Sequence, residues 1–316
     1  MILRVGKINM ARKRSAKPVI IILICLVVLF ALWVGISLGL YGIYFGRRFE
    51  SNTMFLNHVE NFEGLERTRY EFSSDKGQTI VGYMYSSGTE QKAIIVFSHG
   101  YGAGGHNSYM PVINFFAQNG YYVFAYDATG NDESGGKGIG GVPQGVIDLN
   151  YAISFVEESG NFPDLPIGLF GHSWGGYSVS NVLTYHPEVE AVIECSGPNS
   201  STDLVEGGGS KVVGPVIHVL MPVIKVYERA KYGEYATNSA LTGFASTDAE
   251  IMIVHSSDDN IVPIEYGYDI YYDAFKDDPR FTFIRLEGKG HNLFLNVNNN
   301  LELYESFVAF YDENLF

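Results

Sequence analysis

The sequence predicts an α/β protein whose mostly parallel, twisted β-sheet is covered by helices on both faces. Short apolar segments alternate with segments of helical length from about residue 93 to the C-terminus, which is the order that parallel strands joined by right-handed crossovers require. A separate and longer apolar run precedes this part of the chain. With 316 residues, the chain is long enough for one large α/β domain and an additional segment.

The N-terminal part has the pattern of a membrane anchor. Residues 1–17 contain six Lys or Arg side chains, and residues 18–46 contain no charged residue. The densest apolar part, residues 19–40, would be about 33 Å long as a helix with about 1.5 Å per residue, which is enough to cross a bilayer. Because only Arg47 and Arg48 follow this helix closely, we expect a single-pass protein with a cytoplasmic N-terminus and an extracytoplasmic body.

A cleaved signal peptide is the alternative interpretation of this run. Its apolar region would span only about 7–15 residues and would end at a cleavage site of small residues, for which the sequence gives no convincing candidate. We therefore favour an uncleaved signal anchor. The predicted organisation is a basic cytoplasmic tail (1–17), a transmembrane anchor (18–46), a connector (47–66) and a large domain (67–316).

Charge is distributed unevenly along the chain. All eight Lys and Arg residues before Phe49 lie in a stretch without Asp or Glu, so the body carries 13 bases against 35 acids, a formal charge of −22. An acidic body argues against nucleic-acid binding, because the phosphate backbone demands the opposite sign. The two cysteines, Cys25 and Cys195, suit neither a disulfide framework nor a metal site. Residues 135–141 are glycine-rich but lack the Gly-Lys-Ser/Thr ending of a phosphate loop, and we predict no cofactor.

The large domain is expected to begin with a β-hairpin. Residues 69–73 and 79–85 form its strands, and the turn lies at 75–77. A buried strand at 93–97 and a helix from about 110 to 119 come next. The following elements alternate in the same way: strand 122–126, helix 143–158, strand 167–170, helix 177–185 and strand 189–195.

The alternation stops between residues 197 and 250. This interval contains an apolar stretch, residues 212–226, that Pro215 and Pro222 interrupt. The interval is too long for an ordinary loop, and the stretch is too short and too broken for a second membrane span, so we expect a small helical cap at about 198–248. The pattern then resumes with strand 251–255, helix 264–275, strand 281–286 and a last helix from about 297 to 310.

A candidate nucleophile lies at the turn after strand 167–170. The sequence there is Gly171-His172-Ser173-Trp174-Gly175-Gly176, which contains the G-x-S-x-G pattern in the strand–turn–helix context that gives it meaning. Glycines let the strand and the helix approach closely around a strained serine. We therefore expect Ser173 to present its hydroxyl from a rigid turn.

A serine hydroxyl needs a base that a third group orients, and in this fold class their order along the chain is Ser, acid, His. His291 lies directly after strand 281–286, at the same carboxyl edge of the sheet as Ser173, and is the predicted base. The other histidines downstream of the serine are His186, His218 and His255.

The acid is expected in the loop after strand 251–255. Asp258 and Asp259 both lie there, and Asp259, four residues before Pro263, fits better.

An oxyanion needs donors fixed where negative charge develops. We predict the backbone N–H of Trp174, next to the nucleophile, and that of Tyr101, in the loop after strand 93–97. The Tyr101 phenol is a second candidate donor.

Four segments together resemble the α/β-hydrolase fold superfamily, in particular its group of serine aminopeptidases, monoacylglycerol lipases and cinnamoyl esterase-like enzymes. They follow one another in the family's order over about four fifths of the chain, residues 67–316. The resemblance implies the α/β-hydrolase fold and the triad Ser173, Asp259 and His291, and it is specific for the fold but not for the substrate. The segments are Ser98-His99-Gly100-Tyr101-Gly102, Gly171-His172-Ser173-Trp174-Gly175-Gly176, Asp259-Asn260-Ile261-Val262-Pro263 and Gly290-His291.

Residues 127–134 depart from the family's D-x-R-G-x-G-x-S loop. Thr129 stands where the family has Arg, and Asp132 stands where it has Gly. The contacts that such an arginine makes to neighbouring loops are therefore not predicted here.

The sequence thus predicts a membrane-anchored serine hydrolase that cleaves small-molecule carboxylic esters through an acyl-enzyme. A serine peptidase of the aminopeptidase type is the alternative, and it would need an acid for the free amine, for which Glu206, Glu228 and Glu234 are available in the cap. Thioester hydrolysis and acyl transfer also remain open, although the apolar cap residues tilt the prediction slightly toward acyl or lipid-like substrates. A non-catalytic binding module is disfavoured, because all three triad residues are present.

Overall fold

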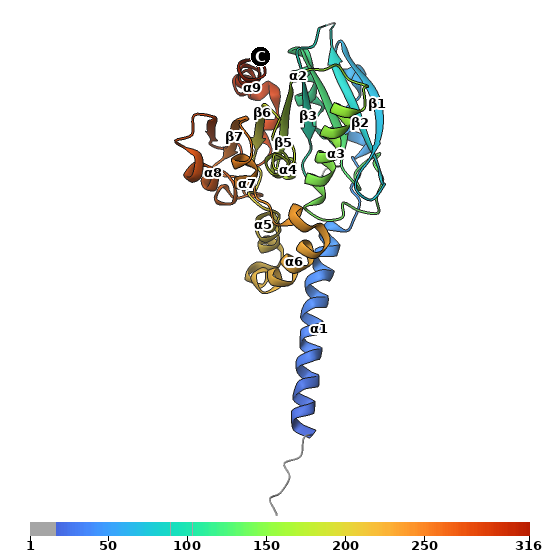
Figure 1. Ribbon diagram of the computed structural model, residues 1–316, viewed down its shortest axis with the longest axis vertical. Coiled ribbons are helices and arrows are strands. Elements are labelled where there is room, and N and C mark those ends of the chain that lie inside the picture. Colours follow the sequence, from blue (N-terminus) through green and yellow to red (C-terminus); the bar gives the residue numbers. More distant parts are fainter. Residues whose placement is uncertain (1–16, 89, 103) are drawn as a thin grey trace, which may run out of the picture.

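The protein is described from a computed structural model, which covers residues 17–88, 90–102 and 104–316. The predicted basic tail therefore lies outside the described residues, except for Lys17. An eight-stranded sheet forms the centre of the body (Figure 1). The helices are α1 Lys17–Phe45, α2 Met110–Gln118, α3 Gln144–Glu158, α4 Trp174–Val182, α5 Ser201–Val213, α6 Ile217–Tyr232, α7 Ala240–Ala245, α8 Tyr268–Phe275 and α9 Leu301–Asn314. The strands are β1 Leu65–Ser73, β2 Thr79–Ser87, β3 Ala93–Ser98, β4 Tyr121–Asp127, β5 Ile167–His172, β6 Ala191–Cys195, β7 Glu250–Ser256 and β8 Phe281–Leu286.

The sheet is mostly parallel, as the alternation of elements predicts. Its strand order is β1-β2-β4-β3-β5-β6-β7-β8. β1 and β2 form the predicted antiparallel hairpin and β2 pairs antiparallel with β4, whereas every later pair of neighbours is parallel. The carboxyl ends of β3, β5, β7 and β8 therefore lie at one edge of the sheet, where the loops that follow them meet.

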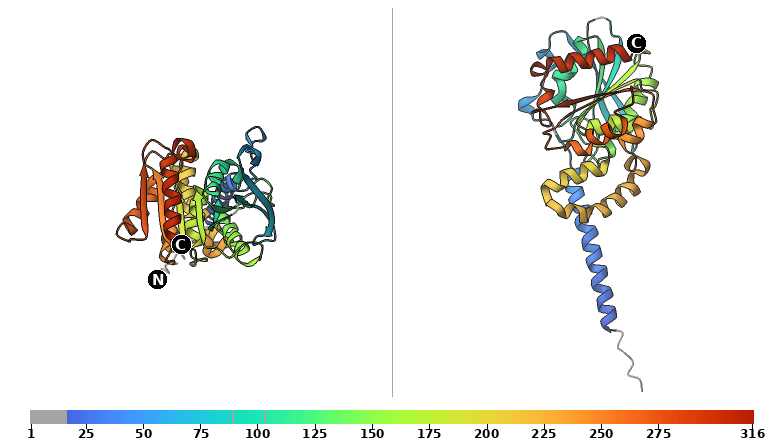
Figure 2. Two further views of the ribbon diagram at one scale, coloured as in Figure 1. Left: turned by 90° about the horizontal axis from the view of Figure 1, so that it is seen from above. Right: turned by 90° about the vertical axis from the view of Figure 1, so that its left-hand side faces the viewer.

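Two apolar layers hold the helices to the sheet. Val146 of α3 and Val179 of α4 are buried on one face, and Phe116 of α2 and Phe307 of α9 are buried on the other. Figure 2 shows helices on both sides of the sheet. Removal of this apolar surface from water is the main favourable contribution to folding.

The predicted helix 264–275 is not continuous. A single 3₁₀ turn, Ile264–Tyr266, precedes α8, and Gly267 between them has φ −139° and ψ −93°. A Cβ at Gly267 would lie 2.3 Å from the carbonyl oxygen of Gly197. The chain turns here to pass the neighbouring backbone, a constraint that the apolar pattern does not reveal.

The interval for which a helical cap is predicted contains α5, α6 and α7. We call α5 and α6 the cap helices; they lie at the end of the body from which α1 extends, whereas α9 lies at the opposite end (Figures 1 and 2). The segment Ser201–Ala245 is apolar enough overall to count as a candidate membrane span. Its longest helix, α6, has only 16 residues, or about 24 Å, which is less than the ~30 Å of a hydrocarbon core.

α1 is the other candidate membrane span, and it has two parts. Residues 17–32 are exposed, and from Trp33 onward the helix contacts α6. The Trp33 indole N–H donates a hydrogen bond to the carbonyl oxygen of Val219 at 2.7 Å, and the Tyr41 hydroxyl donates one to the buried carboxylate of Glu228. The outer part of α1 is thus bound to the cap helices rather than joined to the body by a free linker.

Candidate active site

Ser173 occupies the turn between β5 and α4. Its backbone has φ 59° and ψ −116°, a conformation that L-residues rarely adopt. The glycines on either side are required by close approach: a Cβ at Gly171 would lie 2.2 Å from the carbonyl oxygen of Gly175, and a Cβ at Gly175 would lie 2.0 Å from that of Ser98. The turn therefore holds the serine at the carboxyl end of β5 with little freedom to move.

The structure brings Ser173, His291 and Asp259 together in a chain of hydrogen bonds. The Ser173 Oγ lies 2.9 Å from Nε2 of His291, and the His291 Nδ1 lies 2.6 Å from Oδ2 of Asp259. All three side chains are buried. This arrangement leaves the Nδ1 hydrogen facing the carboxylate and the Nε2 lone pair facing the serine hydroxyl, as a base for that hydroxyl requires.

Asp259 is held by more than the histidine. Its Oδ1 accepts the backbone N–H groups of Ile261 and Val262 at 2.8 and 2.9 Å, and His255 approaches its Oδ2 at 3.3 Å. Burial alone would raise the pKa of Asp259, but the hydrogen bonds from His255, His291 and Ile261 outweigh it and hold this pKa below its usual range. The group is therefore a carboxylate at neutral pH.

Asp258 and the other downstream histidines lie elsewhere. The Asp258 Oδ1 accepts the Ser256 hydroxyl and the backbone N–H of Gly290, so this neighbouring carboxylate orders the loop instead of meeting His291. His255 is buried beside Asp259 as a second donor, a contact that the sequence analysis did not foresee. His218 is exposed in α6, and His186 lies near the end of α4.

The two predicted oxyanion residues lie close to Ser173. Trp174 is the first residue of α4, where backbone N–H groups have no intrahelical partner. Tyr101 follows β3 and lines the same cavity as Ser173. The Tyr101 phenol, the second candidate donor, instead donates to the carbonyl oxygen of Tyr44 in α1 at 2.6 Å. The backbone N–H of Tyr101 is thus the better candidate of the two.

A cavity of about 440 Å³ lies over Ser173 and His291. Its walls are mostly apolar and come from three parts of the chain: the outer end of α1, the cap helices, and the loops that follow β3 and β7. Cavities of this size with few polar groups are typical of sites for small organic ligands. The candidate nucleophile therefore faces an apolar binding space.

Comparisons with known proteins give the family and the fold of the chain. The sequence model of the family described as serine aminopeptidase, S33, matches residues 89–261, more than half of the chain. The chain belongs to this family. A monoacylglycerol lipase of Mycolicibacterium smegmatis is 29% identical over 140 residues, which are 42% of this chain and 47% of the relative, so the match spans about half the length of that protein. The uncharacterized protein YqkD of Bacillus subtilis is 24% identical over 260 residues, 81% of this chain and 82% of the relative.

Solved structures agree on the fold. The Pyrococcus furiosus esterase Pf2001 superposes with a TM-score of 0.66 at 18% identity, covering 85% of this chain and 99% of the other. Carboxyl esterase 2 of Tuber melanosporum gives 0.61 at 17% identity, with 83% and 88% covered. An acylaminoacyl peptidase of Pyrococcus horikoshii gives 0.60 at 18% identity, with 81% and 43% covered. The predicted α/β-hydrolase fold is therefore confirmed, whereas esterases and a peptidase both share it.

In this member of the family, a buried histidine connects the three loops of the site. The Gly100 N–H donates to the Tyr109 hydroxyl at 3.0 Å, and that hydroxyl donates to Nδ1 of His172 at 2.8 Å. The His172 Nε2–H donates to the carbonyl oxygen of His291 at 2.9 Å. Burial, with His291 nearby, lowers the pKa of His172 to about 3, so the ring is neutral and carries its proton on Nε2. Neither Tyr109 nor His172 was among the predicted site residues.

The loop at residues 127–134, which lacks the family's arginine, is contacted by an arginine from another part of the chain. Arg48, just after α1, donates to the carbonyl oxygens of Asp132, Ser134 and Gly136 at 2.7 to 2.8 Å. The Asp132 side chain in turn accepts the backbone N–H of Ser51 at 2.6 Å. The segment after α1 is thus fixed to this loop, which the sequence analysis described only as a connector.

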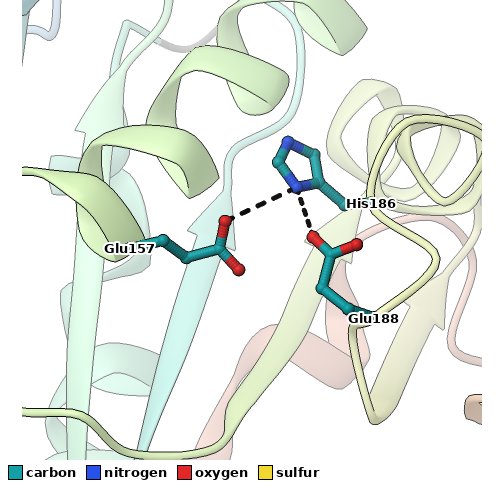
Figure 3. Close-up of side chains that lie close together, drawn as sticks. All are labelled: Glu157, His186 and Glu188. Carbon is teal, nitrogen blue, oxygen red and sulfur yellow. Dashed lines mark hydrogen bonds and ion pairs between the residues drawn. The ribbon is translucent and has the colours of Figure 1, made fainter.

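A second cluster of ionisable groups lies away from the serine, where Glu157, His186 and Glu188 converge (Figure 3). The His186 Nδ1 lies 2.6 Å from Glu188 and 3.8 Å from Glu157, and its Nε2 faces the carbonyl oxygen of Asn150 at 3.1 Å. Each ring nitrogen of His186 thus already lies against an oxygen atom of the protein. Hydrogen bonding accounts for this cluster.

Glu194 of β6 lies behind the serine turn. Its carboxyl is fully buried, accepts the backbone N–H of Gly197 and lies against Gly176 of α4. Burial raises the pKa of Glu194 well above its usual range and so favours the neutral form of the group. The local sequence does not indicate a neutral carboxyl here, because the acid stands within an otherwise apolar strand.

The Tyr109 hydroxyl can be tested by Tyr109→Phe. The change leaves the Gly100 N–H and the His172 Nδ1 without a partner, which we expect to cost about 1–3 kcal/mol of unfolding free energy. Because the same bonds position the loop of Tyr101 and His291, kcat for p-nitrophenyl butyrate should fall about tenfold, with little change in KM. Tyr304→Phe is the matched control, since its buried hydroxyl has no hydrogen-bond partner within the described residues. Equal kinetics of the two variants would contradict a positioning role.

Glu194→Gln tests the buried neutral carboxyl. The folded-state pKa is above the unfolded value of about 4.5, so the unfolded chain releases a proton above that pH and wild-type stability falls as the pH rises. Gln has no such proton, and we expect a melting temperature a few °C higher than wild type at about pH 7.5, with a gap that closes toward about pH 4.5. Circular dichroism of the full chain in detergent measures both, and exposed Glu190→Gln serves as control. No gap at either pH would contradict a neutral Glu194.

Proposed function

We propose that the protein is a membrane-anchored serine hydrolase that cleaves carboxylic esters through an acyl-enzyme. The observation that carries this proposal is the hydrogen-bonded series Ser173–His291–Asp259 beneath a mostly apolar cavity. Membership of a hydrolase family and the likeness to esterase folds support the same class of chemistry. The substrate would place its acyl group in the cavity and its ester carbonyl at Ser173.

The proposed reaction has two halves. The Ser173 oxygen attacks the ester carbonyl carbon while His291 Nε2 takes the hydroxyl proton, and Asp259 stabilises the resulting imidazolium. The tetrahedral intermediate then expels the alcohol, which takes the proton back from His291. A water molecule attacks the acyl-enzyme with His291 as its base, and release of the carboxylic acid restores Ser173.

Negative charge on the former carbonyl oxygen needs donors in both halves. The backbone N–H groups of Trp174 and Tyr101 are the proposed pair, one at the start of α4 and one in the loop that Tyr109 and His172 connect to the site. Removing one donor of such a pair typically slows an acyl-transfer enzyme by about 10²–10³-fold.

The anchor is proposed from α1 and the charges that flank it. The helix has 29 residues, contains no charged residue after Lys17, and is exposed over residues 17–32. Six bases at or before Lys17 favour the orientation in which the N-terminus is cytoplasmic and the hydrolase body lies outside.

The peptidase alternative needs a carboxylate that meets a free amine in the cavity. The three glutamates suggested for this role lie in the described part of the chain, and none of them lines the cavity. Glu206 pairs with His218 at 2.9 Å, and Glu228 is buried against Tyr41.

Asp203 does line the cavity, at the start of α5. Its carboxylate accepts the Ser200 hydroxyl at 2.6 Å, the arrangement of a helix-capping pair. Burial raises the pKa of Asp203. Its place at the start of α5 and its hydrogen bond from Ser200 account for this carboxylate without a substrate amine. Ester substrates are therefore favoured over aminoacyl substrates.

Ser173→Ala tests the nucleophile. We expect the full chain in detergent to lose turnover of p-nitrophenyl butyrate by about 10⁴-fold or more, because the remaining groups have no atom to acylate. Labelling by a fluorophosphonate probe should also disappear. Ser306→Ala on α9 is the control and should label normally. Undiminished labelling of Ser173→Ala would rule out this serine as the nucleophile.

The substrate class is tested with a panel of p-nitrophenyl esters of different chain length, an acyl thioester and aminoacyl p-nitroanilides. We expect kcat/KM for the best ester to exceed that for the best anilide by at least about 100-fold, since the cavity walls are mostly apolar. The full chain is required, because α1 contributes to the cavity. A preference for anilides that Asp203→Asn removes would favour the peptidase instead.

A further inference from the structure

The outer end of α1 is a wall of the active-site cavity. Leu40, Tyr44 and Phe45 of this helix line the cavity, opposite Val213, Leu220 and Ile224 of the cap helices. A helix with the composition of a membrane span thus contributes directly to the space above Ser173. The position of α1 in the bilayer therefore sets the depth at which the cavity lies.

The length of α1 fixes that depth. A hydrocarbon core of about 30 Å needs about 20 helical residues. Counted from Pro18, which follows the last base of the tail, the span ends near residue 37. The part of this span that stands clear of the body, residues 18–32, is only about 23 Å long and cannot cross the core alone. Several residues that contact the cap must therefore lie within the core.

α6 runs beside this part of α1 and in the same direction. Trp33 bonds to Val219, and eight residues further on Tyr41 bonds to Glu228, nine residues after Val219. The level of residue 37 on α1 therefore corresponds to about residue 223 on α6. The beginning of α6 lies below that level, inside the core, and its end lies above it.

Exposed Lys and Arg side chains are found on α6 only above that level, where Val226 is also 70% exposed. Val219 and, in the 3₁₀ turn just before α6, Val216 lie below that level and are 60% and 54% exposed. The one ionisable residue between them, His218, pairs with Glu206. Exposed bases begin above that level, at Lys225. Paired ionisable groups are the form in which charges are tolerated at membrane depth.

The charge of the cap supports the same placement. Residues 207–233 carry four exposed bases and one acid, the buried Glu228, whereas the body from Phe49 on carries −22. An apolar stripe bordered by bases is the pattern of a helix that lies at a lipid surface. The four bases are Lys211, Lys225, Arg229 and Lys231.

We propose that the cap helices are immersed in the outer leaflet and that the cavity receives the acyl chain of a membrane lipid directly from that leaflet, with α1 as one of its walls. This inference rests on the proposed anchor and on the proposed ester hydrolysis, and it adds the substrate class: an ester of a bilayer-resident acyl chain. A second copy of the chain covering Val216 and Val219 is the competing occupant of this surface.

Depth is measured with tryptophan substitutions in the full chain, reconstituted in phosphatidylcholine–phosphatidylglycerol vesicles with and without acyl-chain-brominated lipid. We expect the brominated lipid to quench the added emission of Val219→Trp strongly and that of Val226→Trp less. Leu301 lies on α9, at the far end of the body, and is 49% exposed, so the emission that Leu301→Trp adds should not be quenched. Trp33 and Trp174 contribute the same background to each. Equal quenching at residues 219 and 301 overturns the proposal, as does concentration-dependent cross-linking between copies through residue 219.

Substrate delivery is measured with the double variant Val216→Asp/Val219→Asp. Hydrolysis of 1-oleoylglycerol in the vesicles should fall at least about tenfold, because charged side chains resist burial in the core. Hydrolysis of water-soluble p-nitrophenyl acetate should stay within about twofold of wild type, which also shows that the variant is folded. Leu301→Asp should change neither rate. Equal loss on both substrates, or loss on neither, overturns the proposal.

The cavity wall is tested by Leu40→Trp. The larger side chain should shorten the longest p-nitrophenyl ester that is hydrolysed efficiently, measured as the ratio of kcat/KM for each ester to kcat/KM for the acetate ester of the same variant. An unchanged chain-length profile overturns the assignment of α1 as a wall. If instead the wild-type chain cleaves no ester in a Ser173-dependent way, the proposed function itself fails, an outcome distinct from each of these.

Discussion

The position of Ser173 depends on a turn with no room for a side chain on either side of it. Gly171 and Gly175 allow β5, α4 and the end of β3 to meet within contact distance, and the Ser173 N–H donates to the carbonyl oxygen of Cys195 at 2.8 Å to fix the turn against β6. This contact fixes the positions of the two residues that flank Ser173. His172 must point toward Tyr109 and the loop of His291, and Trp174 must begin a helix.

The order of elements and most of their bounds could be predicted from the sequence, because apolar periodicity and turn residues report local structure. The predicted site residues could be named for a related reason: parallel strands bring the loops after β5, β7 and β8 to one edge, so order along the chain implies proximity. The break at Gly267 could not be predicted, because it is caused by close contact with the backbone of Gly197, some 70 residues away along the chain.

Contacts between distant segments account for the rest. Tyr41 and Glu228 are 187 residues apart, and nothing in either local sequence indicates the other. Arg48 counted in the sequence only as a charge, yet it closes the loop at residues 132–136. Tyr109 was missed for the same reason, since it acts through His172 on β5. The partners of His255 and Glu194 are only three or four residues away, but nothing in the local sequence shows that both side chains are buried beside those partners.

α1 is both the proposed membrane anchor and a wall of the cavity, so the proposed location of this protein is linked to its working state. Many anchored enzymes hang from a linker that a protease can sever, releasing a complete catalyst. Here the segment after the helix is tied down by Arg48, and the helix itself supplies Leu40, Tyr44 and Phe45 to the cavity. A body shed by cleavage after residue 48 would keep Ser173, His291 and Asp259 but lose one side of its cavity. Shedding would therefore release an enzyme with an open, altered site instead of an active soluble form.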